Sequence, residues 1–173
     1  MKETPQQYAQ RVVGYLEGKD PVEVLSMTPR ELQKLIKGAS KKSLDVRPDP
    51  DKWSATMILA HLADSEIVYA FRLRHMLAAS GVTIQATDQD AWAATFAYGT
   101  QDPAASVEDF RVNRERTLRM LKKLSKQQWD CYGVHTERGK ETVRRAVELI
   151  AGHDINHLRQ IHAILGKGVG HSA

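Results

Sequence analysis

The spacing of apolar residues along the chain is helical almost throughout, and no segment shows the alternation expected of a half-buried strand. This restricts the chain to folds in which helices pack on helices. Thr4 is placed to cap a short first helix, and Asp20 opens a further turn. Thr28 and Glu31 then form a capping box, which predicts that a helix starts at Pro29.

Three longer helices follow, predicted over residues 55–79, 107–124 and 142–165. Ser54 and Ser106 are the N-caps of the first two. The connections between them cover residues 80–105, with a short helix around 89–98, and residues 125–141. Four main helices predict an all-α four-helix bundle, and a length of 173 residues predicts a single domain over residues 1–173.

Composition favours a globular protein, with 42% apolar and 27% charged residues. The formal net charge of +4 is spread along the chain, whereas a nucleic-acid-binding surface calls for a denser basic patch. One basic cluster stands out, and we expect it to be a solvated helix face without a nucleic-acid partner. Its residues are Arg114, Arg116, Arg119, Lys122, Lys123 and Lys126.

The chain carries no sign of export or membrane insertion. Cys131 is its single cysteine, so no intrachain disulfide can form, which favours a reducing compartment. The first ten residues are polar, and no run of about 18 apolar residues occurs. We therefore expect a cytoplasmic protein with no membrane partner. Bundles of this size often dimerise through an apolar face, so a homodimer is a hypothesis.

Three of the seven histidines form a pattern suited to a metal ion. His153 and His157 are four residues apart in the last predicted helix, which places them on one face, about 40° apart. Two such imidazoles can ligate one ion, and His61 in the helix over 55–79 supplies a third. A three-histidine site keeps positions open for water or substrate. The alternative is that these histidines are hydrogen-bonded core residues.

The levels of these histidines constrain the topology. His61 lies about 10 Å from the start of its helix, and His157 lies about 12 Å from the end of its own. They meet only if the second and fourth main helices are antiparallel. An up-down-down-up bundle satisfies this, and it needs a long crossover between helices two and three, which residues 80–105 can supply.

Several segments resemble the DinB-like superfamily, and more closely its YfiT-like branch of metal-dependent hydrolases. They are Trp53-Ser54, the run from His61 to Glu66, and the run from Gly152 to Ile161. The resemblance implies a four-helix bundle with an unusual crossover and a divalent metal, zinc or nickel, held by His61, His153 and His157. Members of the family include thiol-S-transferases and a thiol-dependent isomerase that use low-molecular-weight thiols. The family often has a glutamate where this chain has Met57.

Four further residues are candidates for supporting roles. Asp64 and Gln160 each follow a histidine by three residues and are candidates to orient it, the alternative being ordinary surface polarity. Arg72 lies three turns past His61, where it can receive a substrate carboxylate or else pair with an acid such as Glu66 or Asp90. His135, expected in a loop, is a candidate substrate contact or a loop-stabilising residue.

The sequence thus favours a metal-dependent enzyme acting on a small molecule, in which a small thiol or water is activated for transfer or hydrolysis. The alternative is a non-catalytic metal-binding protein of the stress response. A fourth protein ligand would favour the structural role, whereas an open coordination position would favour the enzyme.

Overall fold

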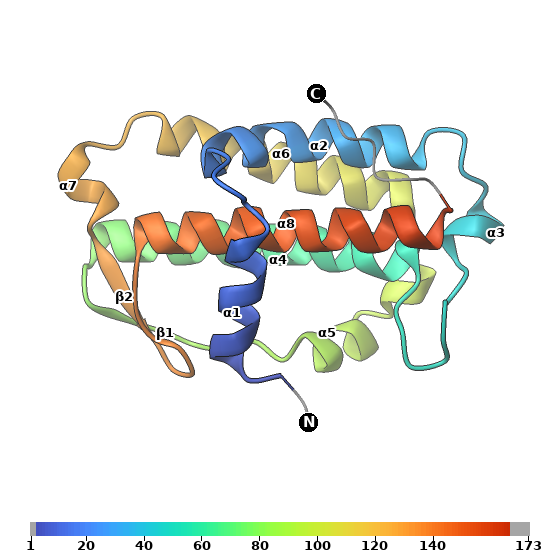
Figure 1. The fold of residues 1–173 in the computed structure, drawn as a ribbon, viewed down its shortest axis with the longest axis horizontal. Coiled ribbons are helices and arrows are strands. Elements are labelled where there is room, and N and C mark those ends of the chain that lie inside the picture. The colour runs from blue at the N-terminus through green and yellow to red at the C-terminus, as the bar shows by residue number, and fades with distance from the viewer. Residues whose placement is uncertain (1–2, 167–173) are drawn as a thin grey trace.

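The computed structural model describes residues 3–166 of the chain, and it is mostly helical (Figure 1). The elements are α1 (Pro5–Gly14), α2 (Pro21–Ile36), α3 (Lys41–Leu44), α4 (Ala55–Ala78), β1 (Val82–Ile84), α5 (Gln89–Thr95), a 3₁₀ turn (Tyr98–Thr100), α6 (Pro103–Leu121), α7 (Lys126–Trp129), β2 (Tyr132–His135), β3 (Gly139–Thr142) and α8 (Val143–Ile164).

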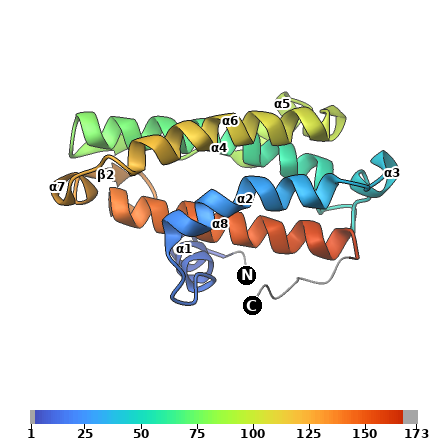
Figure 2. The same ribbon diagram turned by 90° about the horizontal axis from the view of Figure 1, so that it is seen from above.

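Four helices, α2, α4, α6 and α8, form the body of the molecule. Contacts of α2 with α6 and α8, and of α4 with the same two helices, close a ring of four. Figures 1 and 2 show that α4 and α6 run in one direction while α2 and α8 run in the other. The segment between α4 and α6 returns along the bundle and carries β1 and α5. Because α4 and α8 are antiparallel, His61 near the start of α4 can lie level with the C-terminal half of α8.

A small three-stranded sheet lies outside the bundle, so the expectation of an all-α fold is wrong in this respect. β1 pairs in parallel with β2, and β2 pairs antiparallel with β3. The strands are three or four residues long, too short to show a period of two in the sequence. The sheet joins the two long connections, with Ile84 opposite His135 in the register.

Helix α2 starts eight residues before the predicted position. Asp20 caps it by accepting a hydrogen bond from the Glu23 amide, and Pro29 lies inside the helix. A proline there removes one amide donor and leaves the carbonyl of Leu25 without its helical partner. The buried guanidinium of Arg114 donates to this carbonyl at 3.2 Å, which removes part of the penalty. Thr28 caps nothing; its hydroxyl donates to the Val24 carbonyl.

The predicted start of α6 was also wrong. The helix begins at Pro103, and Asp102 caps it by accepting from the amides of Ala104 and Ala105. Ser106 is buried within the first turns. Asp102 supplies the N-cap and Pro103 is suited to the first helical position, so this pair is a stronger start signal than Ser106.

The predicted caps Thr4 and Ser54 are confirmed: Thr4 forms a capping box with Gln7, and Ser54 accepts from the Met57 amide. Thr142, expected as the first residue of the last helix, is its N-cap and accepts from the Arg145 amide. A serine oxygen suffices at the start of α4, although this chain lacks the glutamate that relatives often have at that point. Within residues 3–166, no helix combines the length and apolar character needed to cross a bilayer.

Gly152 in α8 allows α1 to approach closely. A Cβ atom at this position would lie 2.1 Å from the carbonyl oxygen of Val12 and 2.5 Å from its carbonyl carbon. Both are backbone atoms of a crossing helix (Figure 1) and cannot move aside independently. Glycine lowers the stability of a helix relative to alanine, but here only glycine leaves room for the backbone of α1.

We expect a Gly152→Ala variant to lose about 1–3 kcal/mol of unfolding free energy, because overpacking forces α1 away from α8. Urea unfolding would measure the loss. Gly14→Ala is the matched control: a Cβ there meets nothing within 4 Å, so its stability should be unchanged or slightly higher. Equal stability of the two variants would show that α1 is not held tightly against α8.

Candidate metal centre

Three histidines from two helices converge at one point of the bundle. His61 lies on α4, and His153 and His157 lie one turn apart on α8. Their exposed fractions are 6%, 5% and 7%. Each offers a ring nitrogen to a cluster whose atoms all lie within 4.8 Å of one another, and the cluster contains no fourth His, Cys, Asp or Glu among the described residues.

The ring nitrogens that face one another are the Nε2 atoms. Those of His61 and His153 are 3.1 Å apart, and those of His157 and His153 are also 3.1 Å apart. Zinc binds imidazole at about 2.0–2.1 Å, so two ligands at 90° would be about 3.0 Å apart and at a tetrahedral angle about 3.4 Å apart. The observed separations lie between these values. The geometry therefore fits one face of a small divalent ion's coordination shell.

Hydrogen bonding alone does not satisfy this cluster. Nδ1 of His157 lies 2.7 Å from Oε1 of Gln160, a contact in which the ring nitrogen donates and leaves Nε2 without a proton. Nε2 of His153 carries at most one proton, which is best directed to one of its two neighbours. An ion shared by the three lone pairs removes the conflict. Gln160 therefore contacts the ring of His157, and its role in orienting a metal ligand stays a prediction.

The three imidazoles are in the form that binds metal. Burial lowers the pKa of His61 to about 3, and the nearby His157 adds to the effect. Burial likewise lowers the pKa of His157 to about 4, against the opposing effect of its Gln160 hydrogen bond. Burial and both neighbouring histidines hold the pKa of His153 well below its usual value. All three rings are therefore neutral at pH 7, as ligation requires.

Side chains around the cluster fix the rings. The Trp53 ring meets His61 edge-on with centroids 5.1 Å apart, and Tyr69 meets His153 in the same way at 5.6 Å. The hydroxyl of Ser65 lies 3.3 Å from Nε2 of His61. Asp64 does not contact a histidine directly: its carboxylate accepts a 2.7 Å hydrogen bond from the Tyr98 hydroxyl.

Two cavities flank the histidine cluster. One, of about 630 Å³, is lined by His61 and His153, and the other, of about 500 Å³, is lined by His157 and Gln160. Lys52 lines both. The larger cavity extends to the sheet and is of a size that holds a small organic molecule.

Arg72 and His135 both line the larger cavity. Arg72 does not pair with Glu66 or Asp90; its guanidinium donates to the carbonyl of Gln85 at the end of β1. His135 is not in a loop but ends strand β2, where it is 2% exposed. Both residues are predicted candidates for substrate binding, and the pairing of β1 with β2 brings both to the larger cavity.

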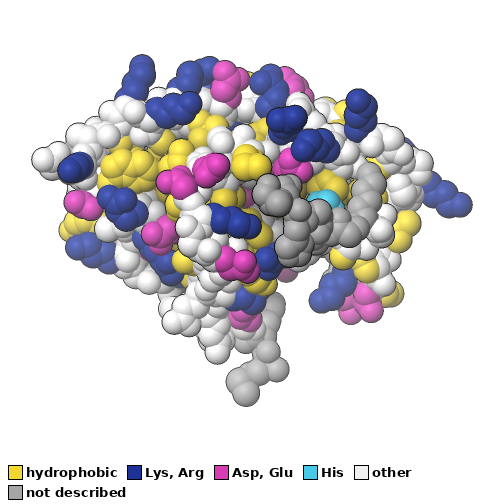
Figure 3. Space-filling view, turned by 45° about the horizontal axis from the view of Figure 1, so that its top comes forward, with side chains coloured by type: hydrophobic (Ala, Val, Ile, Leu, Met, Phe, Trp, Pro, Cys, Tyr) yellow, Lys and Arg dark blue, Asp and Glu magenta, His cyan; other side chains and the backbone are white. Residues whose placement is uncertain are grey.

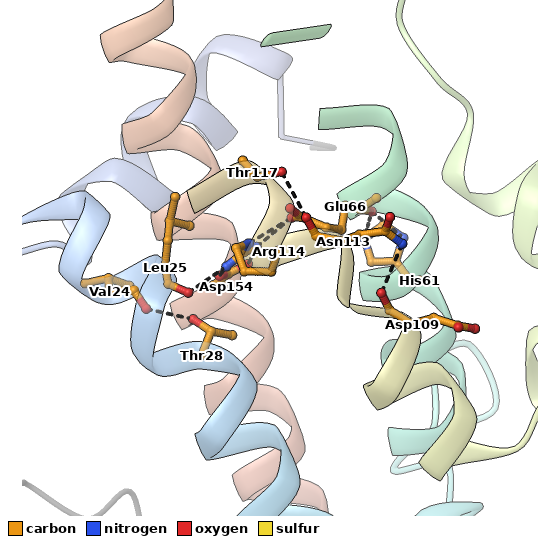
Figure 4. A network of polar contacts seen from close by, with 11 residues as sticks. Val24, Leu25, Thr28, His61, Glu66, Asp109, Asn113, Arg114, Thr117 and Asp154 are labelled. Carbon is orange, nitrogen blue, oxygen red and sulfur yellow. Dashed lines mark hydrogen bonds and ion pairs between the residues drawn. The ribbon is translucent and has the colours of Figure 1, made fainter. Parts of the chain in front are cut away.

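A buried ion cluster lies beside the histidines, and the sequence pattern does not indicate it. Arg114, expected on a solvated face, is 1% exposed, as are Glu66 and Asp154. Figure 4 shows Arg114 between these two carboxylates, with ion-pair distances of 2.8 Å to Glu66 and 2.5 Å to Asp154. With its bond to the Leu25 carbonyl, Arg114 of α6 contacts all of α2, α4 and α8. The sequence signal for this cluster is an acidic residue, Asp154, directly after His153.

The remaining basic cluster on α6 is divided by acids. Arg119 pairs with Glu115 at 2.8 Å, and Glu115 also pairs with Arg111. On the face shown in Figure 3, Lys and Arg side chains are interspersed with Asp and Glu. The predicted cluster is thereby reduced, since Arg114 lies inside the bundle and Arg119 is in an ion pair.

Comparison with known proteins agrees with the fold and the expected family. A protein of Oceanobacillus iheyensis named "Putative metal-dependent hydrolase" is 29% identical over 119 residues, which are 68% of this chain and 68% of that protein. The solved structure of YfiT from Bacillus subtilis, described as a probable metal-dependent hydrolase with an unusual four-helix bundle topology, has a TM-score of 0.78 at 20% identity. The structural match covers 96% of this chain and 92% of the YfiT chain. Residues 25–161 match the profile of the DinB superfamily, and the chain therefore belongs to that superfamily.

Proposed function

We propose that this protein is a metal-dependent enzyme that acts on a small molecule, with His61, His153 and His157 as the ligands of one divalent ion. The convergence of three buried, neutral imidazoles carries the proposal: the Nε2 atom of His153 lies 3.1 Å from that of each of the other two, and the ligand atoms all lie within 4.8 Å of one another. A zinc or nickel ion is suited to such a set of imidazoles. The names given to the two relatives point in the same direction.

The ligand set favours catalysis over a structural role. Structural zinc sites are closed by four protein ligands, whereas catalytic sites keep a position for water or substrate. The described residues supply three ligands here, and a cavity of about 630 Å³ reaches two of them. A bound divalent ion lowers the pKa of a coordinated thiol or water and so supplies a nucleophile near neutral pH.

The chain's own residues have distinct tasks in this proposal. The three histidines hold the ion, and Gln160 keeps the proton of His157 on Nδ1 so that Nε2 faces the site. Trp53 and Tyr69 pack edge-on against the rings of His61 and His153 and restrict their orientation. The cavity walls would bind an electrophilic small molecule within reach of the nucleophile, which we propose to be a low-molecular-weight thiol or water.

We expect the metal-stripped protein to bind one equivalent of zinc or nickel and to gain activity when reloaded. Stoichiometry would be measured by elemental analysis. Activity would be measured with p-nitrophenyl acetate for hydrolysis, and with cysteine and 1-chloro-2,4-dinitrobenzene for thiol transfer. A rate at least about tenfold above the stripped protein in either assay supports the enzyme. Full metal occupancy without a rate increase on these and wider acceptor panels would favour a non-catalytic metal-binding protein, and absence of binding would remove the proposal.

A further inference from the structure

His135 lines the larger cavity and carries a buried donor. Its Nδ1 accepts a 3.2 Å hydrogen bond from the Glu137 amide, so the proton of the neutral ring lies on Nε2. That Nε2 is buried and has no hydrogen-bond partner among the described residues. Leaving a buried donor unpaired costs about 1–3 kcal/mol, which indicates that something absent from the chain accepts from it. Burial, together with the nearby Arg138, lowers the pKa of His135, which keeps the ring neutral.

Arg72 brings a positive charge to the same wall. Its guanidinium is anchored by donation to the Gln85 carbonyl, one residue beyond Ile84, which is the register partner of His135. The end of β1 is itself tied to β2, because the Thr136 amide donates to Ile84. The sheet therefore links the carbonyl that holds Arg72 to the strand that carries His135, and both residues line the same cavity as His61 and His153.

The charges on this cavity suit a single negative charge. Arg138 also lines it, but its guanidinium is held by Glu141 through two hydrogen bonds, at 2.6 Å and 3.0 Å. Glu3 is likewise paired with Arg11. Of the charged groups lining the cavity, those in no ion pair within residues 3–166 are the cations Arg72 and Lys52 and the anion Glu137. Apart from the proposed divalent ion, one net positive charge remains, which matches a monoanion.

We infer that Arg72 and the Nε2–H group of His135 form a subsite for a carboxylate of the substrate, which is held with its reactive end toward the histidine cluster. A guanidinium and an imidazole N–H can each donate to one carboxylate oxygen. This inference rests on the proposed function for its orientation toward the metal ion. The subsite itself belongs to the sheet and the end of α4, and it can be tested without metal.

Benzoate, as a probe of the subsite, is expected to bind the full-length metal-free protein at least about tenfold more tightly than its neutral isostere benzamide. Binding would be followed by NMR titration, with the His135 ring resonances shifting on addition of benzoate. An Arg72→Met variant should weaken benzoate binding about tenfold or more, and His135→Phe should also weaken it. Arg74→Met is the matched control, because Arg74 donates to the Ala70 carbonyl and does not line the cavity; its affinity should stay within about twofold.

The outcomes separate the subsite from the metal site. Equal affinity for benzoate and benzamide, or equal effects of Arg72→Met and Arg74→Met in folded proteins, would overturn the subsite even if zinc binds. Tighter binding of phenyl phosphate than of benzoate would overturn the assignment to a carboxylate. Benzoate binding that depends on Arg72, in a wild-type protein that binds neither zinc nor nickel, would support the subsite and refute the proposed metal function.

Discussion

A His157→Leu variant is expected to lose the divalent ion that we propose the wild-type protein binds, and with it any metal-dependent activity. Two remaining imidazoles, His61 and His153, leave the ion without one of three ligands. At free zinc a thousandfold above Kd, ligand binding stabilises a fold by about 4 kcal/mol, and this gain should be close to zero in the variant. Thermal unfolding with and without zinc, together with elemental analysis, would measure both effects.

His75→Leu is the matched control for this experiment. His75 lies on α4 beside Phe71, away from the cluster, so the control should bind one equivalent of metal with unchanged affinity. Gln160→Leu should fall between the two, with affinity reduced about 10–100-fold, because the orienting bond to His157 is lost while all ligands remain. If His157→Leu kept the stoichiometry and affinity of the wild type, the ion would be bound elsewhere and the assignment would be wrong.

An Arg114→Met variant is expected to lose about 3–5 kcal/mol of unfolding free energy. The substitution keeps most of the volume but leaves Glu66 and Asp154 buried without their cation, and it removes the donor to the Leu25 carbonyl. Many domains have a total stability of about 5–15 kcal/mol, so the variant would be marginal. Urea unfolding monitored by circular dichroism would measure the change.

Arg116→Met provides the comparison on the same helix. Arg116 is exposed, so its replacement should change stability by no more than about 0.5 kcal/mol. A second variant that also carries Glu66→Leu and Asp154→Leu should recover much of the loss, because an apolar replacement of the whole ion cluster leaves no unpaired charge. A small effect of Arg114→Met alone would mean that water reaches the two carboxylates.

Part of the histidine cluster was predictable because it depends on helical geometry alone. The spacing of His153 and His157 fixes them on one face of α8 whatever packs against it. His61 then follows from its level on α4, given antiparallel packing. Gln160 was predictable for the same reason, being one turn from His157. Asp64, by contrast, has an equivalent spacing from His61 but contacts Tyr98, a partner that lies in a connection.

The position of Arg114 was not predictable from local patterns. It lies in a segment rich in arginine, and only the packing of α6 against three other helices distinguishes it from the exposed Arg116. The course of α2 through Pro29 has the same origin. A local rule stops or starts a helix at such a proline, but a donor from another helix satisfies the carbonyl that the proline leaves free.

By itself, the sequence determined the main helices, the N-cap of α4 and the face on which the histidines lie, because periodicity and capping act over a few residues. Only the tertiary structure decided the three-stranded sheet, the buried ion cluster and the cavity wall formed by Arg72 and His135. Each of these depends on pairing residues that are far apart in the chain, such as Ile84 with His135 and Glu66 with Arg114. Backbone hydrogen bonds and Coulomb attraction stabilise such pairs and offset the cost of desolvating them, and local spacing does not encode which distant residues will meet.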